Sequence, residues 1–301
     1  MKKNLYLTLF TLLFILTAHI AFAQTASVDT IGDKGEKKSG LKIGLNYLSN
    51  AVLLGRADTV RTSLLEPEIK YTFAPGIYIT GNLEYVPNRK KHHVDGGSLG
   101  LGYDFEIGDN LSGGVSYTKL FYSSSSTQIG SAISHSFNAN LDYNIGDIIT
   151  PSISVDYNII KQGFGNDVLL NAGINHDFTI EDVFGDGDEL TFTPTATVNA
   201  GTQNFYDAYF SVKKYKVTQK GQAKEARAKA LLAANAAKLS QFTLLDYELS
   251  MPIEYKTGIF IFSVTPTYAI ARNKLPAQIT STMVNSNNGI FYLQVGVVVK
   301  I

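Results

Sequence analysis

The 301-residue chain contains no cysteine and no tryptophan, and after its first two dozen residues it has no long apolar run. The absence of cysteine excludes disulfide bonds and thiolate metal ligands. The absence of a second run of about 20 apolar residues argues against a membrane-spanning helix in the rest of the chain. No phosphate-binding glycine loop or zinc signature occurs either. What remains is a chain of zero formal net charge that is rich in tyrosine, phenylalanine and glycine.

The first 23 residues have the pattern of a secretory signal peptide. Lys2 and Lys3 form the positive start, an apolar stretch follows over residues 5–16, and a small-x-small site ends at Ala23. The alternative is an uncleaved membrane anchor, but the apolar stretch is short for a spanning helix. We therefore expect export, cleavage between Ala23 and Gln24, and a periplasmic N-terminal linker over residues 24–40.

Residues 41–301 show the period-2 alternation of apolar and polar residues that is typical of half-buried β-strands. Twelve segments carry it: 41–49, 64–73, 77–86, 97–106, 111–122, 133–144, 149–160, 168–179, 190–200, 243–255, 259–271 and 290–301. The apolar faces of the sixth and tenth segments are expected to begin at Ile133 and Leu245. Five prolines fall inside the segments, and each removes a ladder donor. They are Pro67, Pro151, Pro194, Pro252 and Pro266.

The connections between the segments alternate in length. Short ones fall at 74–76, 107–110, 145–148, 181–189 and 256–258, and longer ones at 50–63, 87–96, 123–132, 161–167, 201–242 and 272–289. Exported barrels have short periplasmic turns and longer extracellular loops. A Gly-Asp pair recurs at two of the short turns, where glycine can adopt positive φ. The sequence therefore predicts an all-β fold, a transmembrane antiparallel up-and-down β-barrel of about twelve strands.

A soluble β-sandwich would show the same alternation with its apolar face turned inward. Three features favour the barrel: strands of ten or more residues, tyrosines near strand ends, and a last strand that finishes at the chain terminus. Closure into a barrel also removes the exposed edges of a long sheet. We therefore expect the apolar faces to contact lipid and the polar faces to surround an aqueous lumen.

These features resemble those of bacterial outer-membrane β-barrels of the porin-like class, over about residues 41–301. The segment Phe291–Ile301 is similar to the C-terminal strand that the barrel assembly machinery reads, although many members end in Phe or Trp where this chain has Ile301. The resemblance implies the outer membrane of a Gram-negative bacterium as the location. It also implies outer-membrane lipids and lipopolysaccharide as partners, the assembly machinery during biogenesis, and no nucleic acid.

If lipid lies outside, the inward-facing charged residues line the pore. The acidic candidates are Glu66, Glu68, Glu84, Asp104, Asp142, Asp156, Asp177, Asp246, Glu248 and Glu254, and the basic ones are Lys42, Lys70 and Lys300. Fixed carboxylates raise the local concentration of cations in a narrow channel, so this balance predicts cation preference. The alternative is that the carboxylates only hydrate a polar wall or pair with a plug.

The longer loops carry the opposite charge. Basic residues gather at Arg89, Lys90 and Lys91 and again at Lys213, Lys214 and Lys216. At the outer rim these residues could contact lipopolysaccharide phosphates, by the same electrostatics that draws polybasic segments to anionic surfaces. The alternative is an ordinary solvated loop.

Residues 219–240 are built from strong helix formers, which predicts a helical insertion in the longest extracellular loop. A strand extension over residues 205–217 is expected to precede it. The helix could cap the pore, fold into the lumen, lie on the membrane surface, or remain exposed without a gating role.

Catalytic residues are not expected. A serine hydrolase needs a serine and a histidine within hydrogen-bond reach, and the nearest candidate is Ser134-His135-Ser136. Neighbouring residues of a strand point to opposite faces, so His135 is better explained as a membrane-interface residue. The acidic turn at 184–189 lacks the ligand spacing of a calcium loop, and we expect no metal site and no cofactor.

The sequence therefore favours a passive, cation-preferring channel for small hydrophilic solutes that performs no chemistry. One alternative is a closed structural or accessory barrel that binds lipopolysaccharide or another envelope protein through its outer loops. The other is a lipid-modifying outer-membrane enzyme, which would need a serine and a histidine converging at the outer rim.

Overall fold

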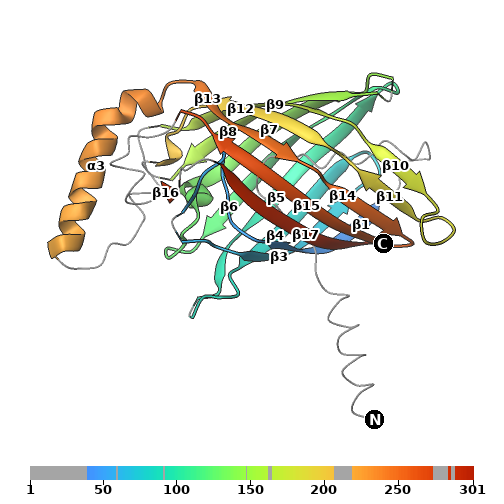
Figure 1. Cartoon of the computed structure of the whole chain (residues 1–301), viewed down its shortest axis with the longest axis horizontal. Coiled ribbons are helices and arrows are strands. Elements are labelled where there is room, and N and C mark those ends of the chain that lie inside the picture. Colours follow the sequence, from blue (N-terminus) through green and yellow to red (C-terminus); the bar gives the residue numbers. More distant parts are fainter. Residues whose placement is uncertain are drawn as a thin grey trace, which may run out of the picture.

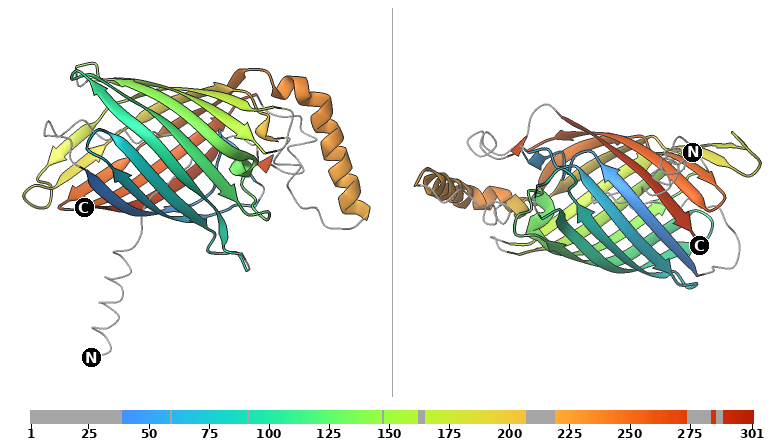
Figure 2. Two further views of the ribbon diagram at one scale, coloured as in Figure 1. Left: turned by 180° about the vertical axis from the view of Figure 1, so that it is seen from behind. Right: turned by 90° about the horizontal axis from the view of Figure 1, so that it is seen from below.

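The computed structural model describes residues 39–58, 60–90, 92–146, 148–161, 165–206, 219–273, 284–285 and 289–301. Over these residues the chain forms a closed, twelve-stranded antiparallel β-barrel (Figures 1 and 2). In this part of the chain no helix is both long and apolar enough to cross a membrane. The expected signal peptide and most of the expected linker over 24–40 lie outside the described residues, so their boundaries stay predictions.

Most barrel strands are continuous. They are β1 (Gly40–Leu48), β3 (Leu64–Thr72), β4 (Ile77–Tyr85), β5 (Val94–Ile107), β6 (Leu111–Tyr122), β7 (Ile133–Tyr143), β8 (Thr150–Ile160), β15 (Phe260–Ala271) and β17 (Ile290–Lys300). Three further strands are interrupted. β9 (Asp167–Asn175) continues as β10 (Phe178–Glu181), β11 (Glu189–Phe192) as β12 (Thr195–Gly201), and β13 (Thr243–Ser250) as β14 (Ile253–Thr257). β1 pairs with β17 and closes the barrel.

The two ends of the barrel differ as predicted. The short turns lie at the end where β1 begins and β17 finishes. Each contains a glycine with positive φ: Gly76, Gly108, Gly146, Gly187 and Gly258. The long loops lie at the opposite, outer end, where helix α3 (Gln219–Leu239) projects beyond the barrel (Figure 1). The helical insertion is therefore confirmed, and it lies outside the lumen. The strand extension expected over 205–217 is wrong at Phe205 and Tyr206, which are helical, and the remainder lies outside the described residues.

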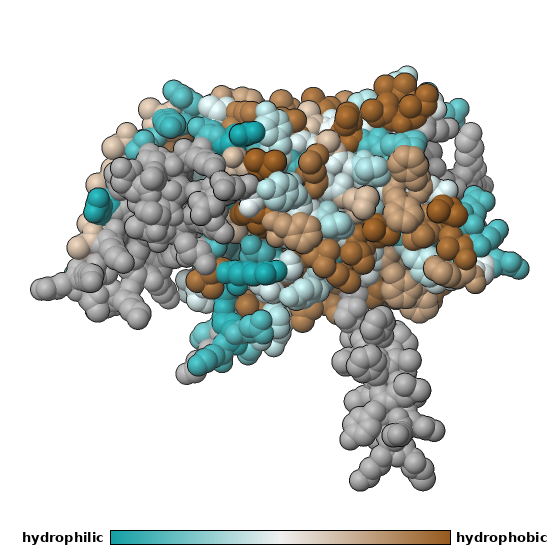
Figure 3. Space-filling view, viewed as in Figure 1, coloured by the Kyte–Doolittle hydropathy of each residue, from teal (hydrophilic) through white to brown (hydrophobic). Residues whose placement is uncertain are grey.

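The apolar faces of the strands point outward. Leu99 and Leu101 on β5 are 59% and 53% exposed, whereas Asn46 on β1 and Asp246 on β13 are fully buried. Apolar residues spread over the barrel wall in Figure 3, with polar residues gathered toward its ends. This is the inverse of a soluble sandwich, which would bury its apolar faces, and it is the arrangement that a lipid-facing wall requires.

Two apolar residues depart from the predicted alternation because of β-bulges. The register between β7 and β8 shifts between Ile133 and His135, and Ile133 is buried. The register between β12 and β13 shifts beside Leu245, which is also buried. An extra residue in one strand reverses the facing of the residues beyond it, so both expectations of an outward side chain are wrong.

The three interruptions lie side by side on neighbouring strands and form one break across the sheet, here called the crease. Residues 176–177, 193–194 and 251–252 separate the paired halves, and they occupy neighbouring positions in an unbroken register. Pro194 and Pro252 lie in the crease, and Pro266 on β15 lies beside it. Proline cannot donate to the ladder, so the crease is where this closed sheet loses backbone hydrogen bonds.

Candidate functional site

The predicted lumen carboxylates lie on the strand faces opposite the exposed apolar residues. Glu66, Glu84, Asp142, Asp156 and Asp246 are all at most 9% exposed. The others, Glu68, Asp104, Asp177, Glu248 and Glu254, are partly exposed. Both groups point toward the barrel axis because residues two apart on a strand share a face. The structure therefore places them on one continuous inner wall.

The inner half of this wall mixes both signs of charge. Lys70 pairs with Asp104 at 3.4 Å, and Lys256 pairs with Glu189 at 3.0 Å. Lys42 is the ladder neighbour of both Lys70 and Lys300, so these lysines gather near the periplasmic end. Fixed positive and negative charges largely offset each other there.

The outer half also contains both signs of charge, with Arg56 and Arg89 among its carboxylates. Glu66, Glu84 and Asp95 form a group, here called the outer acidic cluster, in which each charge acts on its neighbour. The side-chain amide of Gln128 donates to Glu84 and, at 2.8 Å, to Asp95. Glu66 is 1% exposed, and its Oε2 makes no hydrogen bond to any described residue. The cluster is therefore buried, and a side-chain amide supplies part of its hydrogen bonding.

Sequence reasoning missed Asp95 because residues 87–96 were expected to be a loop, whereas β5 begins at Val94. Arg89 pairs with the fully buried Asp95, and its contact with lipopolysaccharide stays a prediction. Lys90 is exposed at the same outer hairpin. The other residues of that expected contact, Lys91, Lys213, Lys214 and Lys216, lie outside the described residues.

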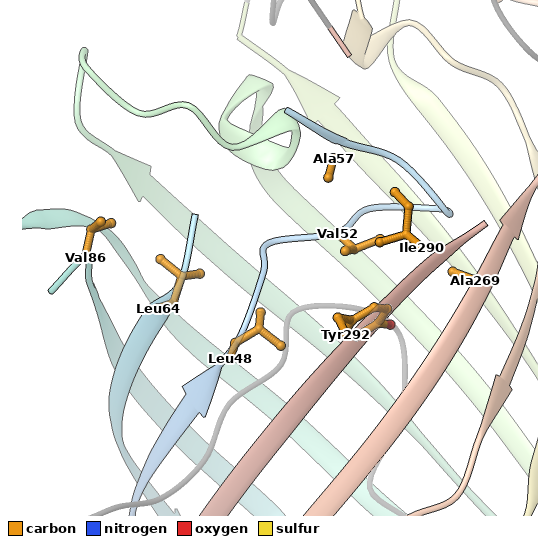
Figure 4. Close-up of a cluster of buried hydrophobic side chains, with 8 residues drawn as sticks. All are labelled: Leu48, Val52, Ala57, Leu64, Val86, Ala269, Ile290 and Tyr292. Atoms are coloured by element: carbon orange, nitrogen blue, oxygen red, sulfur yellow. The ribbon is translucent and has the colours of Figure 1, made fainter. Parts of the chain in front are cut away.

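The first outer loop, residues 49–63, folds into the barrel mouth. It contributes Val52 and Ala57 to a buried apolar cluster, in which side chains from five strands or their ends surround the loop (Figure 4). The other members are Leu48, Leu64, Val86, Ala269, Ile290 and Tyr292. A small hydrophobic core thus fills part of the outer mouth, which narrows the aqueous path.

Arg56 anchors this loop to the opposite wall. Its guanidinium is buried and donates to the carbonyl oxygens of Leu245 at 3.2 Å and Arg272 at 2.6 Å, and to that of Leu54 in its own loop. Gly55 has φ of 69°, and a Cβ there would come within 2.8 Å of the Ala271 backbone nitrogen. Only glycine allows so close an approach, so the loop tip is fitted against β15.

Further contacts join this loop to other outer loops. Strand β2 (Ala57–Asp58) pairs with β16 (Val284–Asn285) from the last outer loop. The hydroxyls of Thr62 and Thr127 are 2.9 Å apart, which connects it to the loop that contains the short helix η1 (Ile129–Ala132). The mouth is therefore covered by loops that support one another.

Asp246 lies on the wall to which Arg56 is anchored. The side chains of Glu248 and Asn199 are its polar neighbours, and the Arg56 charge is near enough to act on it. Asn199 and Asn171 are hydrogen-bonded at 2.8 Å on the adjoining strands. The constriction therefore has a polar, acidic surface facing the loop.

No residue group described by the structure has the arrangement of three or more His, Asp or Glu side chains that a metal ion requires. The lumen carboxylates are spread along the wall instead.

No family model and no curated protein matches the sequence. Among solved structures, the chain is similar to the KdgM porin, with 11% identity, a TM-score of 0.47, and coverage of 86% of this chain and 98% of that one. It is similar to the NanC porin, with 10% identity, a TM-score of 0.46, and coverage of 87% of this chain and 100% of that one. The chain is also similar to LpxR from Salmonella typhimurium, with 8% identity, a TM-score of 0.39, and coverage of 86% of this chain and 99% of that one. The likeness is one of fold: a closed, twelve-stranded antiparallel β-barrel with an apolar outer wall and a polar interior.

Proposed function

We propose that this protein is a passive, cation-preferring channel for small hydrophilic solutes, narrowed at its outer mouth by residues 49–63. The observation that carries the proposal is the polar inner wall, on which Glu68, Asp104, Asp177, Glu248 and Glu254 are partly exposed. A permeating cation passes these carboxylates, and the acidic residues buried behind them add to the field. An anion entering from outside meets repulsion at the same place.

The proposal includes no catalytic step. The Ser134 hydroxyl donates to the Ile159 carbonyl oxygen, and the two ring nitrogens of His135 lie 2.7 Å from Tyr117 Oη and Lys119 Nζ. The nearest serine–histidine candidate is therefore engaged in other contacts, and its residues do not form a nucleophile–base pair. Cleavage of the signal peptide near Ala23 and Gln24, and recognition of the last strand by the assembly machinery, belong to the same proposal.

Reversal potentials in planar bilayers test the proposal. Under a potassium chloride gradient, we expect discrete conductance steps and a reversal potential displaced toward the potassium equilibrium potential. The double variant Asp177→Asn, Glu254→Gln should reduce that displacement because it removes two partly exposed carboxylates from the inner wall. Asp109→Asn, which removes one charge at an exposed inner turn, should leave it unchanged. A folded but silent barrel would contradict the channel, and displacement toward the chloride potential would contradict cation preference.

A further inference from the structure

One ladder row of the inner wall carries small polar residues across neighbouring strands. It begins at Glu106 on β5 and ends at Glu248 on β13, and each residue pairs directly with the next. The positions between the two glutamates are Ser112, Asp142, Ser152, Gly173 and Thr197. Residues that pair directly share one face of a sheet, so the whole row faces the lumen. This row is here called the polar track.

The polar track climbs through the barrel. Glu106 is the last residue but one at the inner end of β5, whereas Glu248 lies on β13, the outer part of its interrupted strand. The track crosses about six interstrand spacings of about 4.8 Å each, on strands tilted by about 40°, so it rises about 18 Å along the barrel axis. A solute that follows the track therefore crosses most of an apolar band about 25 Å tall.

The hydroxyl groups of the track are open to the lumen. Ser112, Ser152 and Thr197 are partly exposed, and their hydroxyls make no hydrogen bond to a described residue. A Cβ at Gly173 would lie 2.8 Å from Ser152 Oγ and 3.4 Å from Thr197 Oγ1. These two hydroxyls therefore border a hollow that exists because position 173 has no side chain. Each hydroxyl can donate one hydrogen bond and accept others.

An amide and a further hydroxyl flank the track on its outer side. The Asn140 Nδ2 donates to Asp142 Oδ2 at 3.3 Å, which uses one amide proton and leaves Oδ1 and the other proton for a solute. Ser154, the ladder partner of Asn140, is partly exposed, and its hydroxyl also makes no hydrogen bond to a described residue. Donors and acceptors therefore lie side by side at the spacing of paired residues, about 5 Å.

The charge of this wall disfavours anionic solutes. On the inward faces of β6, β7, β8, β9 and β12, as the structure describes them, there is no lysine or arginine. The inner-wall lysines of β1, β3 and β17 lie across the lumen from β8: Lys42, Lys70 and Lys300. An anion on the track would meet Glu106, Asp142 and Glu248 without a counter-charge beside them. An uncharged solute with several hydroxyls can donate to these carboxylates and exchange hydrogen bonds with the serines.

We propose that the polar track binds uncharged, polyhydroxylated solutes, of which neutral oligosaccharides are the type. A hydroxyl of such a solute enters the hollow at Gly173 and bonds to Ser152 and Thr197, while its neighbours bond to Asn140 and Ser154. Successive groups along the row offer the next bonds as the solute moves. The inference deepens the proposed channel function and rests on it for passage. Binding itself needs only access from the periplasmic end, where the track begins.

Equilibrium dialysis of the folded, detergent-solubilised barrel tests binding, with maltotriose as the neutral probe and a uronate trimer as its anionic counterpart. We expect maltotriose to bind more tightly. The variant Ser152→Ala, Thr197→Val should weaken that binding on the order of tenfold, because each lost hydrogen bond weakens it a few-fold. Gly173→Ala fills the hollow without changing any charge and should weaken it as well. Heat-modifiable gel migration shows that each variant is folded.

Thr265→Val is the matched control, because it removes a partly exposed, inward-facing hydroxyl of β15 that lies outside the track. It should leave maltotriose binding unchanged. A loss in Thr265→Val as large as that in the double variant, or tighter binding of the uronate trimer than of maltotriose, would overturn the proposal.

Passage is measured separately, as transient occlusion of the potassium current in planar bilayers by maltotriose. Occlusion that weakens in the double variant but not in Thr265→Val is the expected result. A conducting barrel that neither binds maltotriose nor is occluded by it would overturn the track and leave the channel standing. A silent barrel that binds maltotriose in dialysis would contradict the channel and leave the track standing.

Discussion

At the scale of single residues, Arg56 determines how open the outer mouth is. Removing a guanidinium from water is costly, and the cost is offset here by carbonyl oxygens of its own loop and of the opposite wall. A bulky charged residue is thus retained inside the barrel because it connects the loop to the strands. An arginine in a loop has no periodicity that could reveal such a role from sequence.

Replacing Arg56 with alanine should release residues 49–63. Hydrogen bonds to a charged group each contribute about 1.5–3 kcal/mol, so local opening of the loop should become easier by on the order of 2 kcal/mol. We expect faster amide exchange in this loop and a larger single-channel conductance. Arg61→Ala is the control, because the Arg61 guanidinium donates to the Ser49 carbonyl oxygen, which belongs to the same loop. Unchanged exchange and conductance in Arg56→Ala would show that Arg56 is not the anchor.

The lumen carboxylates show how far residue-level prediction reaches. Glu66 and Glu84 could be assigned to the inner wall because they alternate with apolar residues inside regular strands. Asp95 could not, because a bulge between β4 and β5 follows Glu84 and hides the start of β5. Their assembly into one cluster with Gln128 depends on a loop contact that no local pattern encodes.

At the scale of elements, the crease depends on how the sheet compensates for its prolines. The Thr193 amide donates to the Pro252 carbonyl oxygen at 2.9 Å, but Pro252 has no N–H to return the bond. The hydroxyl of Thr195 instead donates to the Thr193 carbonyl oxygen at 3.0 Å. A side chain therefore substitutes for one missing ladder donor.

A double-mutant cycle tests this substitution. Thr195→Val removes the hydroxyl with little change of shape and should destabilise the barrel by about 1 kcal/mol, because a backbone acceptor loses its partner. In a Pro252→Ala background the restored N–H can reach Thr193, so the same change should cost less. Urea unfolding in detergent measures the change in unfolding free energy that Thr195→Val causes in each background. Equal costs in the two backgrounds would contradict the compensation.

Element boundaries were largely predictable because period-2 patterning persists wherever one strand face contacts lipid. The failures at Ile133 and Leu245 occur at bulges, which insert a residue without changing composition. The breaks at residues 176–177, 193–194 and 251–252 also escaped prediction. Proline indicated a lost donor at two of them, but only the three-dimensional register shows that they align.

At the scale of the whole molecule, the strand pattern and the alternating short and long connections were enough to predict a closed barrel of about twelve strands. The facing of the lumen carboxylates follows from the alternation within the strands. The narrowing of the mouth does not, because it arises from contacts between residues 49–63, β15 and other loops that are distant in sequence. Loop packing depends on tertiary fit, and no sequence periodicity reports it.

The central claim is that the apolar wall contacts lipid while the polar wall contacts water. Because the chain lacks tryptophan, one introduced indole reports on one position. Phe137→Trp places it on the outward face of β7, and Tyr78→Trp places it on the inward face of β4. In bilayers, brominated lipid should quench the fluorescence of the first and aqueous iodide that of the second. The reverse pattern, with lipid quenching the indole at position 78 and iodide that at position 137, would contradict the account.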